Sequence, residues 1–301
     1  MSERLALSKL VPGAVCGTFR LREATHSATW DGYPFLRMLL EDFSGQIHAY
    51  AWTDELIELL DLPDYSLVRI AGQVRRYRGK LRIDVTSVQP LLQPVERSAA
   101  ALIPRGLCPV PELLPTLMTA VEQICLPPLR GFVESVLADT GICFPFVSAP
   151  ASLQHHHRFP GGLLRHSLEC FFLVAKHQEF ARESCELGMV AALFHDVGKI
   201  LTLTHRMRRT SLGASVDHDK LTLEVLAPHL RLLDREWPEG GRELRYLLTW
   251  KMCEKIPKYD MADLVACCDR ISTGLNRRSP HAHGRNCPQL NSADHPALRM
   301  S

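Results

Sequence analysis

The chain has 301 residues, 46% of them hydrophobic, and a formal net charge of +2. Its length favours two domains, and its small net charge excludes a polycation, so nucleic-acid binding would need a local basic patch. The ten cysteines form no C-x-x-C pair and no regular framework, which predicts reduced thiols and a cytoplasmic protein. No apolar run reaches the roughly 20 residues of a bilayer span, so we expect no membrane partner.

Short strand-like runs dominate residues 1–90, which we expect to form the first domain. A short helix is predicted at 53–60, between the third and fourth of five strands, and Arg78-Gly79-Lys80 predicts a tight turn between the last two. This order is that of an OB-fold barrel, a fold that often binds single-stranded nucleic acid. The predicted strands are 13–21, 35–40, 47–52, 67–77 and 81–88.

A run of basic residues without an acidic one lies between Arg69 and Arg82. Because strand side chains alternate between faces, Val68, Ile70 and Val74 should point into the barrel and the basic residues outward. Tyrosine and tryptophan among arginines suit base stacking with phosphate contacts, although a solvated basic hairpin is the alternative. The expected nucleic-acid-binding residues are Trp52, Arg69, Arg75, Tyr77, Arg78, Lys80 and Arg82.

The second half of the chain is predicted to be helical. Residues 91–125 are rich in proline and should form a partly packed connector with a first helix from about Glu112. We expect a helical domain at 126–273 and a flexible, polar tail at 274–301. The predicted helices are 129–139, 163–179, 183–195, 218–233, 243–252 and 261–273. The expected fold class is therefore an α+β multidomain protein, with a five-stranded OB-fold β-barrel followed by an all-α domain.

Nine of the fourteen histidines fall within residues 155–229. Asp196 closely follows the wholly apolar run 189–194 of a predicted helix, and a buried carboxylate needs either a basic partner or a metal ion. His195 is adjacent, His166 lies on the preceding helix, and Asp269 lies on the last one. Two histidines and two aspartates from three helices could enclose one divalent cation, and this mixture of nitrogen and oxygen suits Mn²⁺, Fe²⁺ or Zn²⁺.

The motif His-Asp-Val-Gly-Lys at 195–199, preceded by Gly-Gly-Leu-Leu-Arg-His at 161–166, resembles the HD superfamily of metal-dependent phosphohydrolases. The resemblance implies that Lys199 faces the substrate phosphate. It also implies a divalent metal cofactor, for which we expect Mn²⁺, with Fe²⁺, Zn²⁺ or Co²⁺ as alternatives. The implied metal ligands are His166, His195, Asp196 and Asp269.

The chain resembles the YhaM-type 3′→5′ exoribonucleases more narrowly, over roughly residues 10–272. The motifs are Leu-Glu-Asp-Phe-Ser-Gly at 40–45, Gly-Gln-Val-Arg-Arg-Tyr-Arg-Gly at 72–79 and the histidines before the Gly-Gly turn. Members join an OB domain to an HD domain. The resemblance implies a metal-dependent phosphodiesterase that cleaves single-stranded RNA or DNA, as a 3′→5′ exonuclease. Catalytic roles would fall to Lys199, Asp196, His156 and His157.

Two features leave alternatives open. The triple histidine at 155–157 is also similar to the HD-like domain of MobH-type (TraI-like) conjugative relaxases. The exonuclease family carries a further histidine pair where this chain has Tyr-Leu-Leu-Thr-Trp-Lys-Met at 246–252. His218 could hold a second metal or contact phosphate, whereas His229 is expected at the surface. A nucleotide phosphohydrolase, or a relaxase-like nucleic-acid-binding protein with a degenerate HD site, therefore remains an alternative.

Overall fold

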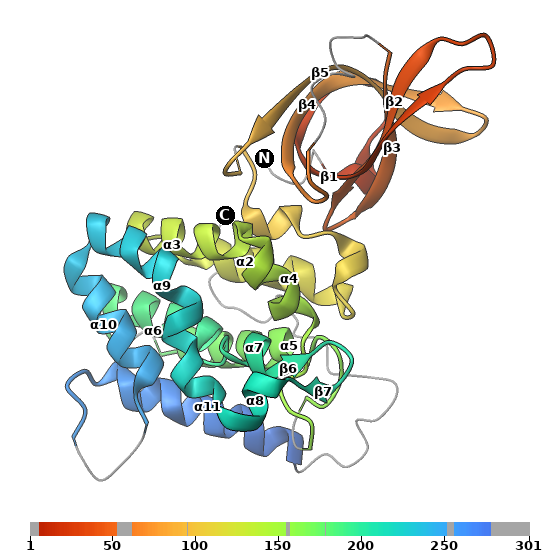
Figure 1. The fold of residues 1–301 in the computed structure, drawn as a ribbon. Helices are drawn as coiled ribbons and strands as arrows, with labels where there is room; N and C mark the ends of the chain where they lie inside the picture. The colour runs from red at the N-terminus through yellow and green to blue at the C-terminus, as the bar shows by residue number, and fades with distance from the viewer. Residues whose placement is uncertain are drawn as a thin grey trace.

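The computed structural model describes residues 6–52, 62–94, 96–154, 157–177, 179–251 and 256–277. The helix predicted at 53–60 and the tail from residue 278 lie outside these residues. The described chain forms a β-barrel and a larger helical unit that contact each other (Figure 1). The fold class predicted from the sequence is thereby confirmed.

The first unit is a closed five-stranded barrel in which the strands follow the order β1-β2-β3-β5-β4. β1 pairs antiparallel with both β2 and β4, while β3 pairs parallel with β5. This closed arrangement is that of an OB-fold. The strands are β1 (Gly13–Ala28), β2 (Pro34–Asp42), β3 (Gly45–Ala51), β4 (Leu67–Tyr77) and β5 (Lys80–Leu91).

The barrel interior is filled by alternate residues of its strands, as the sequence predicts. Val68, Ile70 and Val74 of β4 are all buried, and Phe19 of β1 is fully buried with them. The register between β4 and β5 shifts at Gly72, where Thr86 of β5 is the extra, bulged residue; a Cβ atom on Gly72 would lie 2.4 Å from the carbonyl oxygen of Asp84 on β5. Glycine is therefore required there for the two strands to approach.

The proline-rich connector is packed between the two units. The short helix η3 (Ala99–Leu102) is wholly buried, and η4 (Arg105–Leu107) and η5 (Pro111–Leu113) follow it. Arg97, also buried, pairs with Asp42 of the barrel at 2.8 Å and donates to the Thr18 carbonyl oxygen at 2.9 Å. Arg20 of β1 donates to the carbonyl oxygen of Ala138, in the helical unit, at 3.0 Å. These bonds join the barrel to the helices.

The helical unit departs from the sequence prediction in a few places. A helix at Thr140–Ser148 was not expected because it contains Pro145, and a short hairpin, β6 (Leu203–Thr204) with β7 (Arg208–Arg209), interrupts the helices. The last helix continues to Arg277, beyond its predicted end at residue 273. The main helices are α2 (Leu114–Gln123), α3 (Pro127–Ala138), α4 (Thr140–Ser148), α5 (Gly162–Ala175), α6 (Arg182–Phe194), α9 (His218–Glu236), α10 (Pro238–Thr249) and α11 (Met261–Arg277); α7 (Lys199–Thr202) and α8 (Ser211–Ser215) are short.

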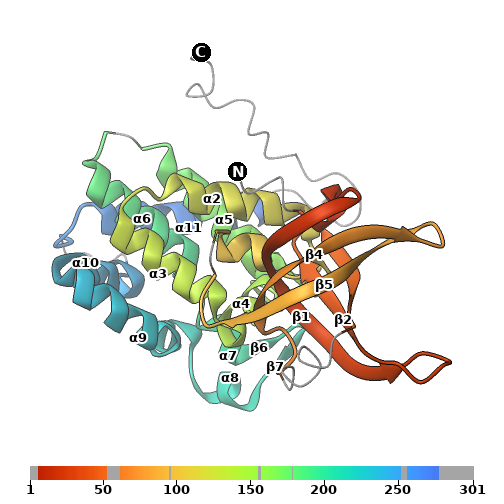
Figure 2. The same ribbon diagram turned by 90° about the horizontal axis from the view of Figure 1, so that it is seen from above.

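α2, α3 and α4 lie on the side of the helical unit next to the barrel, and α11 lies on the opposite side (Figure 1). α5 and α6 run through the middle, and their apolar residues form the centre of one continuous core. The same arrangement is seen from above in Figure 2. Among the described residues no single helix is long and apolar enough to cross a bilayer; α3 and α4 would be so together, but they are bent by 80°.

Candidate metal centre

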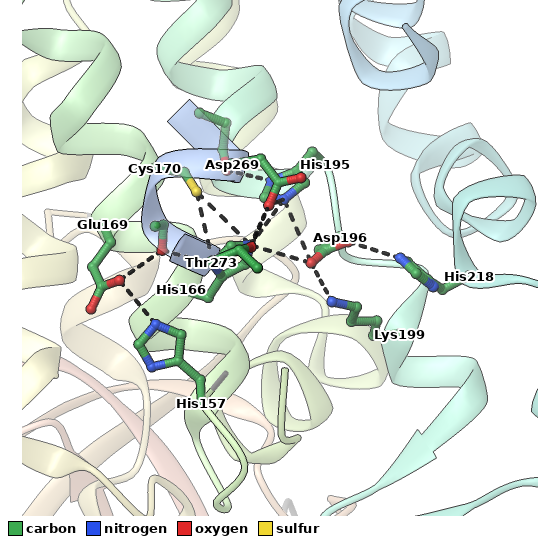
Figure 3. Close-up of polar contacts among 12 residues, drawn as sticks. His157, His166, Glu169, Cys170, His195, Asp196, Lys199, His218, Asp269 and Thr273 are labelled. Atoms are coloured by element: carbon green, nitrogen blue, oxygen red, sulfur yellow. Dashed lines mark hydrogen bonds and ion pairs between the residues drawn. The ribbon is translucent and has the colours of Figure 1, made fainter. Parts of the chain in front are cut away.

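The predicted ligands meet in the middle of the helical unit (Figure 3). His166 lies one turn into α5, His195 and Asp196 directly follow α6, and Asp269 lies on α11. The Nε2 atom of His166 lies 3.2 Å from Nε2 of His195, 3.1 Å from Oδ1 of Asp269 and 3.4 Å from Oδ2 of Asp196. The structure therefore brings all four predicted ligands together.

The donor atoms fit a divalent cation. An imidazole nitrogen has either one proton or one lone pair, so hydrogen bonding can join Nε2 of His166 to only one of its three neighbours. Donors held about 2.1 Å from one ion lie about 3.0–3.5 Å apart, close to the separations seen. The His195 Nε2 atom adds distances of 3.5 Å to Asp196 and 3.7 Å to Asp269. A divalent ion at the centre would satisfy all of these atoms at once.

The second nitrogen of each histidine fixes its tautomer. Nδ1 of His195 lies 2.9 Å from the carbonyl oxygen of Ala192, which can only accept, so this nitrogen carries a proton and the neutral imidazole has its lone pair on Nε2. Nδ1 of His166 lies 3.0 Å from Oγ of Ser272. Both Nε2 atoms are thus presented to the centre, as a metal-binding histidine requires.

Burial and charge set the protonation of the cluster. Burial lowers the pKa of the fully buried His166, which favours the neutral form that binds metal. Burial alone would raise the pKa of Asp196, but Lys199 and His195 outweigh it and hold that pKa well below its usual range. The pKa of Asp269 is likewise lowered, because its contacts with the His166 and His195 imidazoles outweigh its burial. Both carboxylates are therefore ionised.

A chain of hydrogen bonds extends outward from His166. The Ser272 hydroxyl donates to Oε2 of Glu169 at 2.7 Å, and Nε2 of His157 lies 2.9 Å from the same oxygen. Because the Ser272 proton is used in this way, the His166 Nδ1–H donates to Oγ of Ser272. His157 is buried and is held by this outer chain, whereas His156 lies outside the described residues. Sequence reasoning missed Ser272 and Glu169; their i+3 spacing from Asp269 and His166 was the available signal.

Lys199 and His218 flank Asp196 on the side away from α11. Lys199 forms an ion pair with Oδ2 of Asp196, and Nε2 of His218 lies 3.0 Å from Oδ1. In the part of the chain that the structure describes, one group of three or more donors is close enough to share an ion, and neither His218 nor the predicted ligand Asp196 is in it. That group comprises His166, His195, Asp269 and Cys170, with all donor atoms within 4.8 Å of one another.

Gly198 and Thr222 hold the His-Asp motif against the start of α9. A Cβ atom on Gly198 would lie 2.1 Å from the carbonyl oxygen of His218, so only glycine lets the motif reach the start of α9. The Thr222 hydroxyl donates to the carbonyl oxygen of His195 at 3.0 Å and lies 3.3 Å from the Gly198 nitrogen. The motif and α9 are thereby fixed relative to each other.

An aromatic and basic patch covers the outer face of the barrel. The Arg82 guanidinium carbon lies 4.8 Å from the Tyr77 ring centroid, 5.3 Å from that of Tyr50 and 5.9 Å from that of Trp52. Tyr50 and Trp52 are stacked at 19°, and Phe35 lies 5.1 Å from Trp52. Trp52 and Tyr77 are about half exposed. We call these five residues the barrel patch; Phe35 and Tyr50 are not among the nucleic-acid-binding residues expected from the sequence.

The basic residues predicted to bind nucleic acid differ in their surroundings: some form ion pairs, and others lie at the β4–β5 turn. Arg75 and Arg82 both pair with Asp84, which lies just beyond the basic run, and Arg69 pairs with Glu96 at 2.6 Å. Arg78 and Lys80 lie at the β4–β5 turn, where Arg78 and Gly79 both have positive φ angles. Since Tyr77 faces Lys80 across the strands and Arg75 faces Arg82, all four share the face of the barrel patch.

His229 is not at the surface, contrary to the sequence prediction. It is buried, with Nδ1 3.0 Å from Oγ of Ser135 and Nε2 3.3 Å from Oδ2 of Asp139. Asp139 also accepts from the Gly141 nitrogen at the start of α4. His229 therefore ties α9 to α3 and α4, and it lies apart from the metal cluster.

Comparison with known proteins agrees with this geometry. Residues 163–272 match the HD domain family. The 3′-5′ exoribonuclease YhaM of Oceanobacillus iheyensis is 24% identical over 77% of this chain and 72% of its own. The 3′-5′ exoribonuclease YhaM of Halalkalibacterium halodurans is 23% identical over 75% of this chain and 68% of its own length. A solved single-stranded DNA-binding protein of Saccharomyces cerevisiae mitochondria, Rim1, covers 27% of this chain and 96% of its own, at 13% identity and a TM-score of 0.25. The assignment of the barrel as an OB-fold rests on its own strand order and not on this structural match.

Proposed function

We propose that this chain, in which an OB-fold barrel precedes an HD domain as in the YhaM-type 3′-5′ exoribonucleases, is a metal-dependent phosphodiesterase of single-stranded nucleic acid. It would act as a 3′→5′ exonuclease on RNA or DNA. The observation that carries the proposal is the cluster of His166, His195, Asp196 and Asp269 beside Lys199. The eight free thiols in the described part of the chain fit the reducing cytoplasm.

The four predicted ligands suit Mn²⁺, with Fe²⁺, Zn²⁺ or Co²⁺ as alternatives. When bound, such an ion lowers the pKa of a water molecule and polarises the scissile phosphate. Asp269, whose side chain is 42% exposed, lies on the side of the cluster that is open to solvent and substrate.

The chain's own groups would position the phosphate. The Lys199 ammonium, paired with Asp196, would stabilise the negative charge that develops on the phosphoryl oxygens. His218 holds the other oxygen of the same carboxylate and, with a third of its side chain exposed, could contact the phosphate of an adjacent nucleotide. His157 would support His166 through Glu169 and Ser272, without touching the substrate.

Replacing Asp196 by asparagine tests the catalytic part of the proposal. Asp196→Asn should abolish digestion of end-labelled single-stranded RNA and DNA, because it removes a ligand charge at the centre. Asp31→Asn, in the exposed turn between β1 and β2, is the control and should digest both strands normally. The product ladder reports polarity and sugar preference. Digestion at the wild-type rate by Asp196→Asn would sink the proposed mechanism.

Removing Arg82 from the barrel patch separates a strand nuclease from a nucleotide phosphohydrolase. Arg82→Ala should raise the Kd for single strands about tenfold, because base stacking is worth about 1–3 kcal/mol per base and a cation–π contact about 0.5–2 kcal/mol. Arg231→Ala, an exposed arginine of α9, is the matched control. A nucleotide phosphohydrolase would show no change in strand affinity. A relaxase would instead nick one site and retain a DNA end, and a degenerate module would bind strands without cleaving them.

A further inference from the structure

A short basic hairpin follows the metal centre in the chain. Its strands, β6 and β7, pair antiparallel across a tight turn. Arg206 in the turn and Arg208 and Arg209 on β7 are all exposed. No acidic residue occurs in the sequence between Asp196 and Asp217. The hairpin therefore presents three positive charges to solvent, with no opposite charge close to them along the chain.

None of these three guanidinium groups forms an ion pair with a carboxylate of the described residues. By contrast, Arg182 and Arg245 of the same helical unit each pair with a carboxylate, at 2.9 and 2.7 Å. The Arg209 guanidinium donates to a backbone carbonyl oxygen of α8 at 3.4 Å. Within the described ranges, the side chains of Arg206 and Arg208 have no hydrogen-bond partner, so both are available to an external anion.

The hairpin is fixed to α7, the short helix that begins with Lys199. Thr210 directly follows β7; its hydroxyl donates to the carbonyl oxygen of Leu201 at 2.6 Å, and its backbone nitrogen donates to that of Thr202 at 3.0 Å. A Cβ atom on Gly213 would lie 2.5 Å from the same Thr202 oxygen, so α8 packs closely on α7. The hairpin therefore has a defined position relative to Lys199.

Both ends of the segment that carries the hairpin lie at the metal centre. The segment begins after Lys199 and ends at His218, and these two residues contact the two carboxylate oxygens of Asp196. Figure 1 shows β6 and β7 beside α7 and α8, and Figure 2 shows them at the end of the helical unit that carries the barrel. The hairpin thus lies beside the metal centre, on the side of the barrel.

We propose that the basic hairpin binds backbone phosphates of the substrate strand next to the scissile one, through Arg206 and Arg208. A guanidinium group matches the geometry of a phosphate, to which it can donate two parallel hydrogen bonds. The hairpin contains no phenylalanine, tyrosine or tryptophan. It therefore holds the strand by charge, whereas the barrel patch offers rings for base stacking. The inference rests on the proposed function and names the part of the substrate that the helical unit contacts.

The salt dependence of strand binding tests the proposal. Each phosphate that is neutralised on a single strand adds about 0.7 to the slope of log Kd against log salt concentration. Arg206→Gln combined with Arg208→Gln should therefore lower this slope by about 1.4, which raises the Kd about 25-fold at about 0.1 M salt and leaves it unchanged at about 1 M. Fluorescence anisotropy of the full chain with labelled oligouridine and oligothymidine, in EDTA to prevent cleavage, measures both quantities.

Three controls separate a phosphate contact from a general loss of charge. Arg231→Gln combined with Arg235→Gln removes the same charge from exposed positions further along α9 and should leave the slope unchanged. Lysine in place of both Arg206 and Arg208 keeps the charge and should restore most of the slope. A strand of the same length without bases should show the same loss in the glutamine variant, because the hairpin contacts only the backbone.

Equal slopes for the wild type and the glutamine variant of the hairpin would overturn the proposal, and so would an equal fall for the α9 variant. A hairpin that served an acidic protein or an anionic lipid surface instead would give the first of these results. The measurements need no turnover. A chain whose slope falls as expected but that digests no strand would refute the nuclease, while an active nuclease with an unchanged slope would refute the role of the hairpin.

Discussion

Replacing Glu169 by glutamine should weaken metal binding although Glu169 is not a ligand. Its carboxylate accepts from the Ser272 hydroxyl at 2.7 Å and from His157 at 2.9 Å. Ser272 in turn accepts from Nδ1 of His166 at 3.0 Å. Glutamine keeps the length of the side chain but offers a single neutral acceptor oxygen, so the orientation of His166 is less firmly held.

The magnitude follows from the loss of charge. Hydrogen bonds to charged groups contribute about 1.5–3 kcal/mol and neutral ones about 0.5–1.5 kcal/mol, a difference of about 1.2 kcal/mol at the centre of these ranges. Since about 1.4 kcal/mol corresponds to a factor of ten in an equilibrium constant, Glu169→Gln should raise the Kd for the metal about tenfold. Losses of this size are typical of groups that orient metal ligands.

The assay is competition for Zn²⁺ against a chromophoric chelator, read as the fraction of metal retained. Glu179→Gln is the matched control, because Glu179 also binds a histidine, His177, at 2.8 Å, but at an exposed position between α5 and α6. It should leave metal affinity unchanged. Equal affinities for the wild type and Glu169→Gln would refute the reasoning that the outer chain supports His166.

Two further substitutions test the packing. Arg97→Met leaves the buried Asp42 carboxylate without its ion pair and should lower the free energy of unfolding, measured by urea titration, by about 3 kcal/mol. Arg69→Met is the control: its ion pair is about 40% exposed, so the loss should be less than about 1 kcal/mol. Gly162→Ala puts a Cβ atom 2.0 Å from a backbone oxygen and should destabilise by about 1–3 kcal/mol. Gly131→Ala, which meets nothing within 4 Å on α3, should stabilise slightly. Equal unfolding midpoints for the two alanine variants would contradict this.

Local signals in the sequence were sufficient to predict most elements. The β4 strand was predicted with its observed bounds because alternation and the Arg-Gly-Lys turn mark both of its ends. The helix at Thr140–Ser148 was missed because Pro145 is a strong signal against a helix, yet burial of Phe146 and Val147 in the core favours it here. Tertiary packing outweighed the local preference.

The candidate site was predictable only where a motif carried it. His195 and Asp196 could be predicted because they follow an apolar run, and a carboxylate buried at such a position needs a partner in any fold. The spacing of Ser272 from Asp269 places both on one face of α11, but the contact of Ser272 with His166 and the burial of His229 depend on which helix faces cross, and no local pattern encodes that. Asp84 was overlooked beside the basic run because cross-strand register, not sequence distance, places it against Arg75.

The contribution of α11 has a consequence for synthesis of the protein. This helix supplies both Asp269, at the centre, and Ser272, which holds His166 from behind. A growing chain that has left the ribosome only as far as α10 therefore has neither. The proposed nucleolytic centre can therefore assemble only after almost the whole described chain has been translated.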